Sequence, residues 1–171
     1  MPMLKVIAAF IVGAIAGGIV NMTLVTVGPA VIPPPEGVDV TDMESLKTSM
    51  HLLSARHFVF PFLAHALGTL VGALVGYLLA PKYKIRVAWL IGVFTLLGGI
   101  AASSMIPAPK AFIAVDLIFA YLPMAWLAIK LGAAIQGSAA PGSAARIVRI
   151  LIGPKGCIPN KQSIPQPCLL S

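Results

Sequence analysis

Charged residues are scarce in this chain of 171 residues, and their scarcity excludes an ordinary soluble domain. Only 10% of the residues are Asp, Glu, Lys or Arg, 58% are apolar, and the mean hydropathy is +0.97. Soluble domains carry about 25% charged and about 45–50% apolar residues. The composition therefore predicts a membrane protein.

Cysteine is equally scarce, because the chain has only Cys157 and Cys168. Two cysteines exclude a dense disulfide framework, and two thiols alone make a weak metal site. Cys168 begins the final sequence CLLS, which fits the C-a-a-X prenylation pattern. One lipid chain adds little to a protein with several membrane spans, and the modification needs a eukaryotic cytosol. We therefore expect an unmodified Cys168, with lipidation as the alternative.

Long apolar runs are the most abundant feature of the chain. A helix crosses the hydrocarbon core of about 30 Å with roughly 20 residues. The sequence does not alternate polar and apolar residues, which favours helices over strands. Four runs are long enough, at residues 6–32, 58–80, 87–106 and 111–131. We predict an all-α, polytopic membrane protein with a bundle of four transmembrane helices in residues 1–135 and a flexible, basic cytoplasmic tail in residues 136–171.

The basic residues predict the orientation of these spans. With the N-terminus inside, nine Lys and Arg residues fall on the inner side and three, Lys47, Arg56 and Lys110, on the outer side. Cytoplasmic segments carry the excess of Lys and Arg, so both termini are predicted to be cytoplasmic. The net charge of +7 then points to the lipid bilayer as partner, and nucleic acid is a poor alternative because no aromatic platform accompanies the basic residues.

The connection between the first two spans holds four of the five acidic residues. Thr41 and Glu44 have the spacing of a capping box, and apolar residues recur on one face, so we predict an amphipathic helix over about 42–53 on the outer surface. Asp39, Asp42 and Glu44 are weak candidates for a metal site, because helix starts attract acidic residues for their own reason. No cofactor is predicted.

Glycine recurs at helical spacing in the first two spans. Each set lies on one helix face, where small residues allow close packing of a neighbouring helix. These glycines predict helix packing and favour association into a homo-oligomer or a larger membrane complex. They are Gly13 and Gly17 in the first span, and Gly68, Gly72 and Gly76 in the second.

Polar side chains inside the spans form the candidate site. They are Asp116, His65, Asn21, Ser103 and Ser104. The predicted depths of Asp116 and His65 allow the two to meet in an outward-facing pocket, where a histidine beside a carboxylate suits proton coupling. The alternative is that all five only hydrogen-bond across helices, and this structural interpretation is favoured two to one. Pro123 is expected to kink the fourth span.

The segments NMTLVTVGPAVIPPPEGVDVTDMESL and FVFPFLAHALGTLVGALVGYLL carry a resemblance. Over about residues 1–131 the chain resembles small four-helix membrane proteins of bacteria, notably of the Bacteroidetes, to which no activity is assigned. The resemblance implies location in a bacterial inner membrane. The cysteine-containing tail departs from that pattern.

Three function classes follow from these features. A non-enzymatic bundle acting as an accessory or assembly component is the first interpretation. A small oligomeric transporter or channel-like protein, with an outward-facing polar pocket around His65 and Asp116, is the alternative. An enzyme is the weakest, because the spans contain no paired carboxylates, no cysteine nucleophile and no metal constellation.

Overall fold

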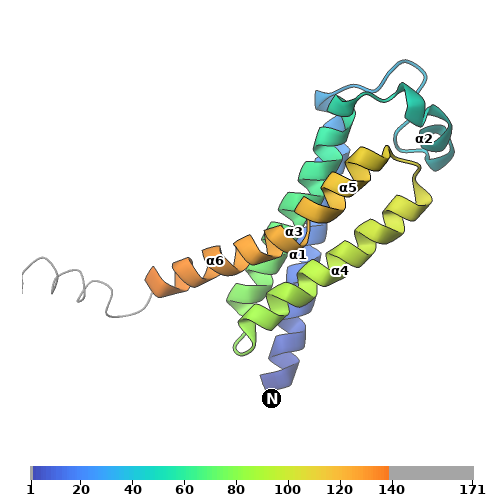
Figure 1. Ribbon diagram of the computed structural model, residues 1–171. Coiled ribbons are helices and arrows are strands. Elements are labelled where there is room, and N and C mark those ends of the chain that lie inside the picture. Colours follow the sequence, from blue (N-terminus) through green and yellow to red (C-terminus); the bar gives the residue numbers. More distant parts are fainter. Residues whose placement is uncertain (1, 139–171) are drawn as a thin grey trace, which may run out of the picture. The chain divides into compact units, whose positions relative to one another are not determined.

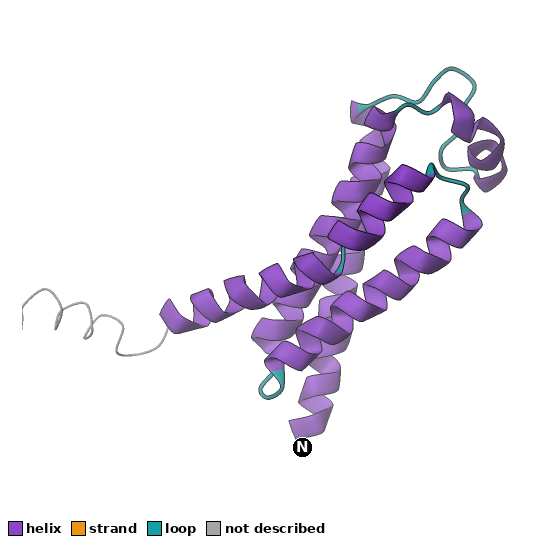
Figure 2. Ribbon diagram, in the orientation of Figure 1, coloured by secondary structure: helices purple, strands orange, loops and turns teal. Residues whose placement is uncertain are grey.

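The structure, a computed structural model, describes residues 2–138, and every regular element in that range is a helix (Figures 1 and 2). The predicted tail from residue 139 onward, with Cys157 and Cys168, lies outside the described residues. Residues 136–138 belong to the last helix. The elements in chain order are α1 (Pro2–Val31), α2 (Met43–Ser49), η1 (Met50–Leu52), η2 (Ala55–Phe58), α3 (Val59–Leu79), α4 (Lys84–Met105), α5 (Lys110–Phe119) and α6 (Leu122–Ser138).

Four helical segments of the described chain are long and apolar enough to cross a membrane. Their bounds are close to the predicted spans, and each extends a few residues further at one or both ends. They are Met3–Val31, Ala55–Leu79, Lys84–Met105 and Lys110–Gly137. The all-helical fold is therefore confirmed.

The fourth segment is broken, as the position of Pro123 predicted. Proline lacks an amide hydrogen and its ring clashes with the carbonyl four residues earlier, here that of Phe119. α5 ends at that residue, Ala120 and Tyr121 form the break, and α6 begins at Leu122. The ribbon changes direction at this point (Figure 1).

α1 and α3 run side by side, with their backbones in contact at the predicted glycines (Figure 1). A Cβ atom added at Gly17 would lie 2.5 Å from the carbonyl oxygen of Gly68, and one added at Gly13 would lie 2.7 Å from that of Gly72. No side chain larger than hydrogen fits between the helices at these positions. The glycine stripes thus serve helix packing within one chain.

The core beside this contact consists mostly of small residues. Ala73, Val87, Ala88 and Ile91 are almost completely buried where α3 and α4 meet, and Ala125 and Ala128 of α6 join the same cluster; the partly buried Phe10 of α1 packs against it. Small side chains let the helices approach closely, so dispersion contacts between them replace contacts with lipid.

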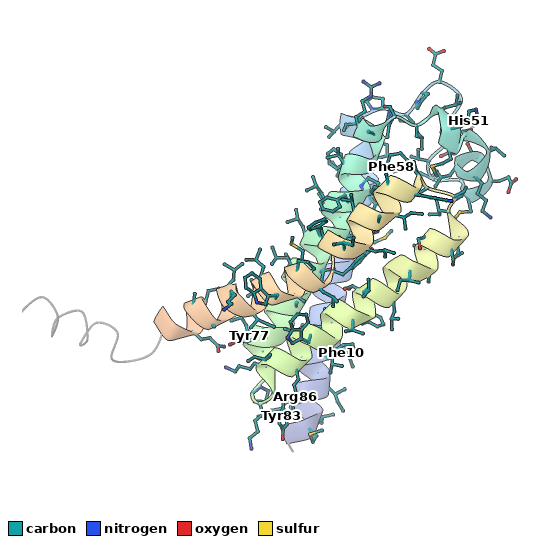
Figure 3. The ribbon with its side chains drawn as sticks, viewed as in Figure 1. Phe10, His51, Phe58, Tyr77, Tyr83 and Arg86 are labelled. Atoms are coloured by element: carbon teal, nitrogen blue, oxygen red, sulfur yellow. The ribbon has the colours of Figure 1, made fainter. Side chains whose placement is uncertain are left out.

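The two ends of the bundle differ in character. The end with the turn Ala80–Tyr83, called the turn end, also holds the start of α1 (Figure 3). Here the Arg86 guanidinium lies 5.1 Å above the Tyr83 ring, and Lys84 donates a 2.6 Å hydrogen bond to Gln136. His51 and Phe58 lie at the opposite end, called the loop end, where residues 32–58 connect α1 to α3 (Figure 3).

The loop end contains the helix predicted over 42–53, as α2 followed by η1. Its cap differs from the predicted one. Asp42 is the N-cap and accepts a 2.7 Å hydrogen bond from the Ser45 amide, whereas Thr41 donates both its amide and its hydroxyl hydrogen to Asp39. The capping box of Thr41 and Glu44 was therefore wrong by one residue, because the Asp39 carboxylate competes for Thr41.

Candidate functional site: a polar cavity between α1, α3 and α4

The structure brings Asp116 of α5 and His65 of α3 together. The Nδ1 atom of His65 lies 2.9 Å from both carboxylate oxygens of Asp116. A ring nitrogen so close to a carboxylate carries the hydrogen, so Nδ1 is the donor and the neutral ring has its lone pair on Nε2. Asp116 therefore fixes both the orientation and the tautomer of His65.

Tyr121 is the third member of this group. Its hydroxyl donates a 2.9 Å hydrogen bond to Asp116 Oδ2, and its ring stacks on the imidazole of His65 with a centroid separation of 5.7 Å. Gly99 of α4 makes the position of Tyr121 possible, because a Cβ atom there would collide with the phenol. The Asp116 side chain is only 6% exposed, so its two donors replace the water that it lacks.

A second hydrogen-bonded pair lies one turn further along α3. Thr69 donates to the hydroxyl of Thr95 on α4 at 3.2 Å, and the Thr95 hydroxyl lies within 3.0 Å of the carbonyl oxygens of Ile91 and Gly92. Thr69 is 1% exposed, so its hydroxyl needs such a partner in an apolar setting. This pair continues the polar surface that begins at His65.

These groups line a cavity of ≈ 280 Å³. The polar part of its wall combines Asn21 of α1 with His65, Thr69, Thr95 and Tyr121. The rest of the wall is built from small residues and one aromatic ring, namely Ala14, Gly17, Gly18, Gly68, Phe94, Gly98 and Gly99. The cavity therefore joins a wall of small, uncharged residues to a polar side that includes His65, the hydrogen-bonded partner of Asp116.

Two polar groups at the cavity have no partner among the described residues. The structure gives no hydrogen bond to Nε2 of His65 or to the side-chain amide of Asn21 within residues 2–138. The imidazole can accept or donate at Nε2, and the amide can do both. These two side chains are the part of the site that is free to bind a ligand.

Ser103 and Ser104 do not join the site. Their hydroxyls donate to the carbonyl oxygens of Ile100 and Ala101, three residues earlier in the same helix, at 2.8 and 2.6 Å. Such local bonds satisfy a serine without a neighbouring helix. Of the five predicted polar residues, His65 and Asp116 form a bonded pair, Asn21 lines the same cavity, and the two serines lie apart.

The predicted set of site residues did not include Tyr121, Thr69, Thr95 or Gly99. Thr69 had a signal, because it follows His65 by four residues and so lies on the same helix face. Tyr121 gave no such signal, because its hydroxyl contacts Asp116 only as a result of the break in the helix before Pro123. A regular helix would place positions 116 and 121 on different faces.

The acidic residues of the loop end make hydrogen bonds of their own. Asp39 accepts from Thr41, and Asp42 accepts from Ser45. No group of three or more metal-ligating side chains occurs within the part of the chain that the structure describes. The weak metal interpretation of Asp39, Asp42 and Glu44 gains no support from this arrangement.

Comparisons with known protein families, curated proteins and solved structures found no match to this chain.

Proposed function

We propose that this protein is an integral membrane protein of a bacterial inner membrane, with four spans and both termini in the cytoplasm. The turn end supports this orientation, because it gathers Lys5, Lys82, Lys84 and Arg86. Cytoplasmic ends carry such an excess, and paired aromatic and basic residues such as Tyr83 and Arg86 suit the membrane interface. Labelling of Cys157 and Cys168 in intact cells tests the orientation. Modification by an impermeant maleimide from outside would contradict it.

Within that setting we propose a non-enzymatic, transporter-like function, in which the cavity binds a small ligand or a proton at His65. The observation that carries this proposal is the pairing of the buried Asp116 with the partly buried His65 beside an otherwise uncharged cavity. Burying an ionisable residue within a membrane span costs free energy. If the pair served only to hold α3 and α5 together, uncharged hydrogen-bonding side chains would do so at a lower cost.

The arrangement of atoms suits proton binding. Nε2 of His65 is the free position and takes the incoming proton, while Nδ1 keeps its hydrogen bond to Asp116. Asp116 stabilises the resulting imidazolium, and the Tyr121 hydroxyl holds the carboxylate in place.

Flux in proteoliposomes tests this function. Asp116→Asn and His65→Ala should abolish pH-dependent proton flux, measured with a dye trapped inside the vesicles. Ser104→Ala should leave it unchanged, because Ser104 bonds only within its own helix. Circular dichroism and gel filtration check that the variants stay folded with an unchanged oligomeric state. Absence of proton flux through the native protein would contradict transport. So would variants whose stability changes while their proton flux does not.

A second candidate function is that of an accessory or assembly component. It is favoured by an exposed apolar stripe on α1, the helix with the smallest buried share of the four candidate spans. Ile11, Ile15 and Ile19 of this stripe are 49%, 57% and 63% exposed and recur every fourth residue. Such a stripe can pack against a neighbouring protein helix, and contact with lipid is the alternative. Cysteine crosslinking from Ile15→Cys in native membranes, with the tail cysteines replaced by serine, separates these cases, because only a protein neighbour gives a discrete product.

A further inference from the structure

The exposed part of the cavity wall lies in the middle of two helices. Gly18 of α1, and Phe94 and Gly98 of α4, line the cavity and are also exposed, Phe94 to 56%. A Cβ atom added at Gly18 or Gly98 would have no neighbour within 4 Å. Both glycines are many residues from either end of their helices. In the proposed four-span arrangement, this opening faces the hydrocarbon of the bilayer.

The chemistry of the wall selects an uncharged ligand. No Lys or Arg occurs among the described residues that line the cavity, and a protonated His65 is already paired with Asp116, so no unpaired cation neutralises a phosphate or a carboxylate there. The free groups are Nε2 of His65 and the amide of Asn21, which recognise hydroxyl and carbonyl oxygens. A hydroxyl donates to the neutral imidazole, whereas a carbonyl accepts from Asn21 or from the protonated imidazole.

The size and shape of the cavity limit the part of the ligand that enters. Its volume of ≈ 280 Å³ lies just below the range of about 300–1,000 Å³ for small-molecule sites. It accommodates one ring or head group, and a longer chain must extend through the opening into the lipid. Five glycines supply backbone surface instead of side chains, and Phe94 at the opening presents an aromatic ring. Such walls suit a flat group.

We infer that the cavity takes its ligand sideways from the bilayer, between α1 and α4, and that this ligand is an uncharged amphipathic molecule with a flat, oxygen-bearing head group, of which a quinone or quinol is the type that fits. The inference rests on the proposed function, since it names the ligand class for the same site. It concerns binding alone and assigns no electron transfer to the protein.

Binding of a decyl-substituted benzoquinone to the full chain in nanodiscs tests the inference. We expect saturable binding to the native protein. Asn21→Leu and His65→Ala, which each remove one hydrogen-bonding group, should raise the Kd by about tenfold. Decyl phosphate, with the same chain and an anionic head, should not compete.

Blocking the opening tests sideways entry. Gly18→Leu and Gly98→Leu each place a side chain in open space at the rim, so they should leave the fold intact and raise the Kd by at least the same factor. Ala101→Leu is the matched control, because Ala101 is an exposed residue of α4 that does not line the cavity. It should bind like the native protein.

The outcomes separate this inference from the proposed function. If the native protein fails to bind the quinone while its proton flux depends on Asp116, transport stands and the ligand class is wrong. If decyl phosphate competes, the head group is anionic and the inference fails. Equal binding by the native, Gly18→Leu and Gly98→Leu proteins would overturn entry from the bilayer. Quinone binding without any proton flux would support the ligand class and contradict transport.

Discussion

The hydroxyl of Tyr121 donates a 2.9 Å hydrogen bond to Asp116 and thereby ties the break before α6 to the last turns of α5. The same carboxylate also accepts from His65 of α3. One side chain thus joins α3, α5 and the start of α6. The predictions below test what these contacts and the backbone contacts around them contribute.

Tyr121→Phe keeps the ring and removes the hydroxyl. We expect the free energy of unfolding to fall by about 0.5–1.5 kcal/mol, because Asp116 loses one of its donors in a buried place. Equilibrium unfolding in mixed micelles measures this. In a double-mutant cycle with Asp116→Ala, which removes the acceptor, the two effects should not add, since both variants remove the same bond. Strict additivity would show that the hydroxyl acts independently of Asp116.

Gly17→Ala and Gly18→Ala form a matched pair of neighbours on α1. At Gly17 the added methyl group meets the Gly68 carbonyl oxygen at 2.5 Å, so α1 and α3 must separate, and we expect a loss of about 1–3 kcal/mol. At Gly18 there is open space, and alanine should be neutral or stabilise the helix by up to about 1 kcal/mol. Unfolding of both variants under one set of conditions checks the difference. Equal effects would mean that the close approach of the helices is unimportant.

Gly99→Ala and Gly98→Ala give the corresponding comparison on α4. A methyl group at Gly99 collides with the phenol of Tyr121, whereas one at Gly98 touches nothing. Gly99→Ala should therefore displace Tyr121 and alter the environment of His65, which is visible as a shift of its imidazole resonances in the NMR spectrum. Gly98→Ala should leave these resonances nearly unchanged. A shift of similar size in both variants would speak against the packing described.

Asp39 provides a prediction about pH. The Thr41 hydroxyl, followed by the Thr41 amide, bonds to its carboxylate and holds the pKa of Asp39 below its ordinary value. The turn that it forms is fully supported above the pKa of the unfolded chain and is lost as the pH falls through the lower pKa of the folded state. Carboxyl NMR titration measures the pKa directly. Thr41→Ala removes only the hydroxyl, so it should raise the pKa part of the way back, and an unchanged value would exclude that bond.

The sequence predicted the structure best for those features that residue type alone decides. Long apolar runs predicted the four apolar segments, and the spacing of Gly13, Gly17, Gly68 and Gly72 predicted which face of α1 and of α3 packs against a neighbouring helix, although not that the two pack against each other. The predicted depths of His65 and Asp116 in the membrane allowed the two side chains to meet. An ionisable group in an apolar run needs a polar neighbour, which favoured this pairing.

The remaining parts of the site depend on tertiary geometry. Tyr121 reaches Asp116 only because the chain leaves its helical path before Pro123, and no periodicity reports that path. The opening between α1 and α4 depends on how the two helices lie relative to each other. Ser103 and Ser104 were misplaced because a serine can satisfy its hydroxyl within its own helix, an outcome that depth alone does not reveal.

The backbone contact of α1 with α3 limits how these two helices can move relative to each other. At Gly17 the backbone of α1 lies directly against the backbone of Gly68, so this contact cannot loosen by a change of rotamer. These helices form a fixed wall of the cavity. The facing wall includes α4 and the break at Tyr121, where side-chain contacts and the hydrogen bonds Thr69–Thr95 and Tyr121–Asp116 replace backbone contact. A ligand larger than the resting cavity would thus be admitted by a shift of α4 and Tyr121, with α1 and α3 as the stationary frame.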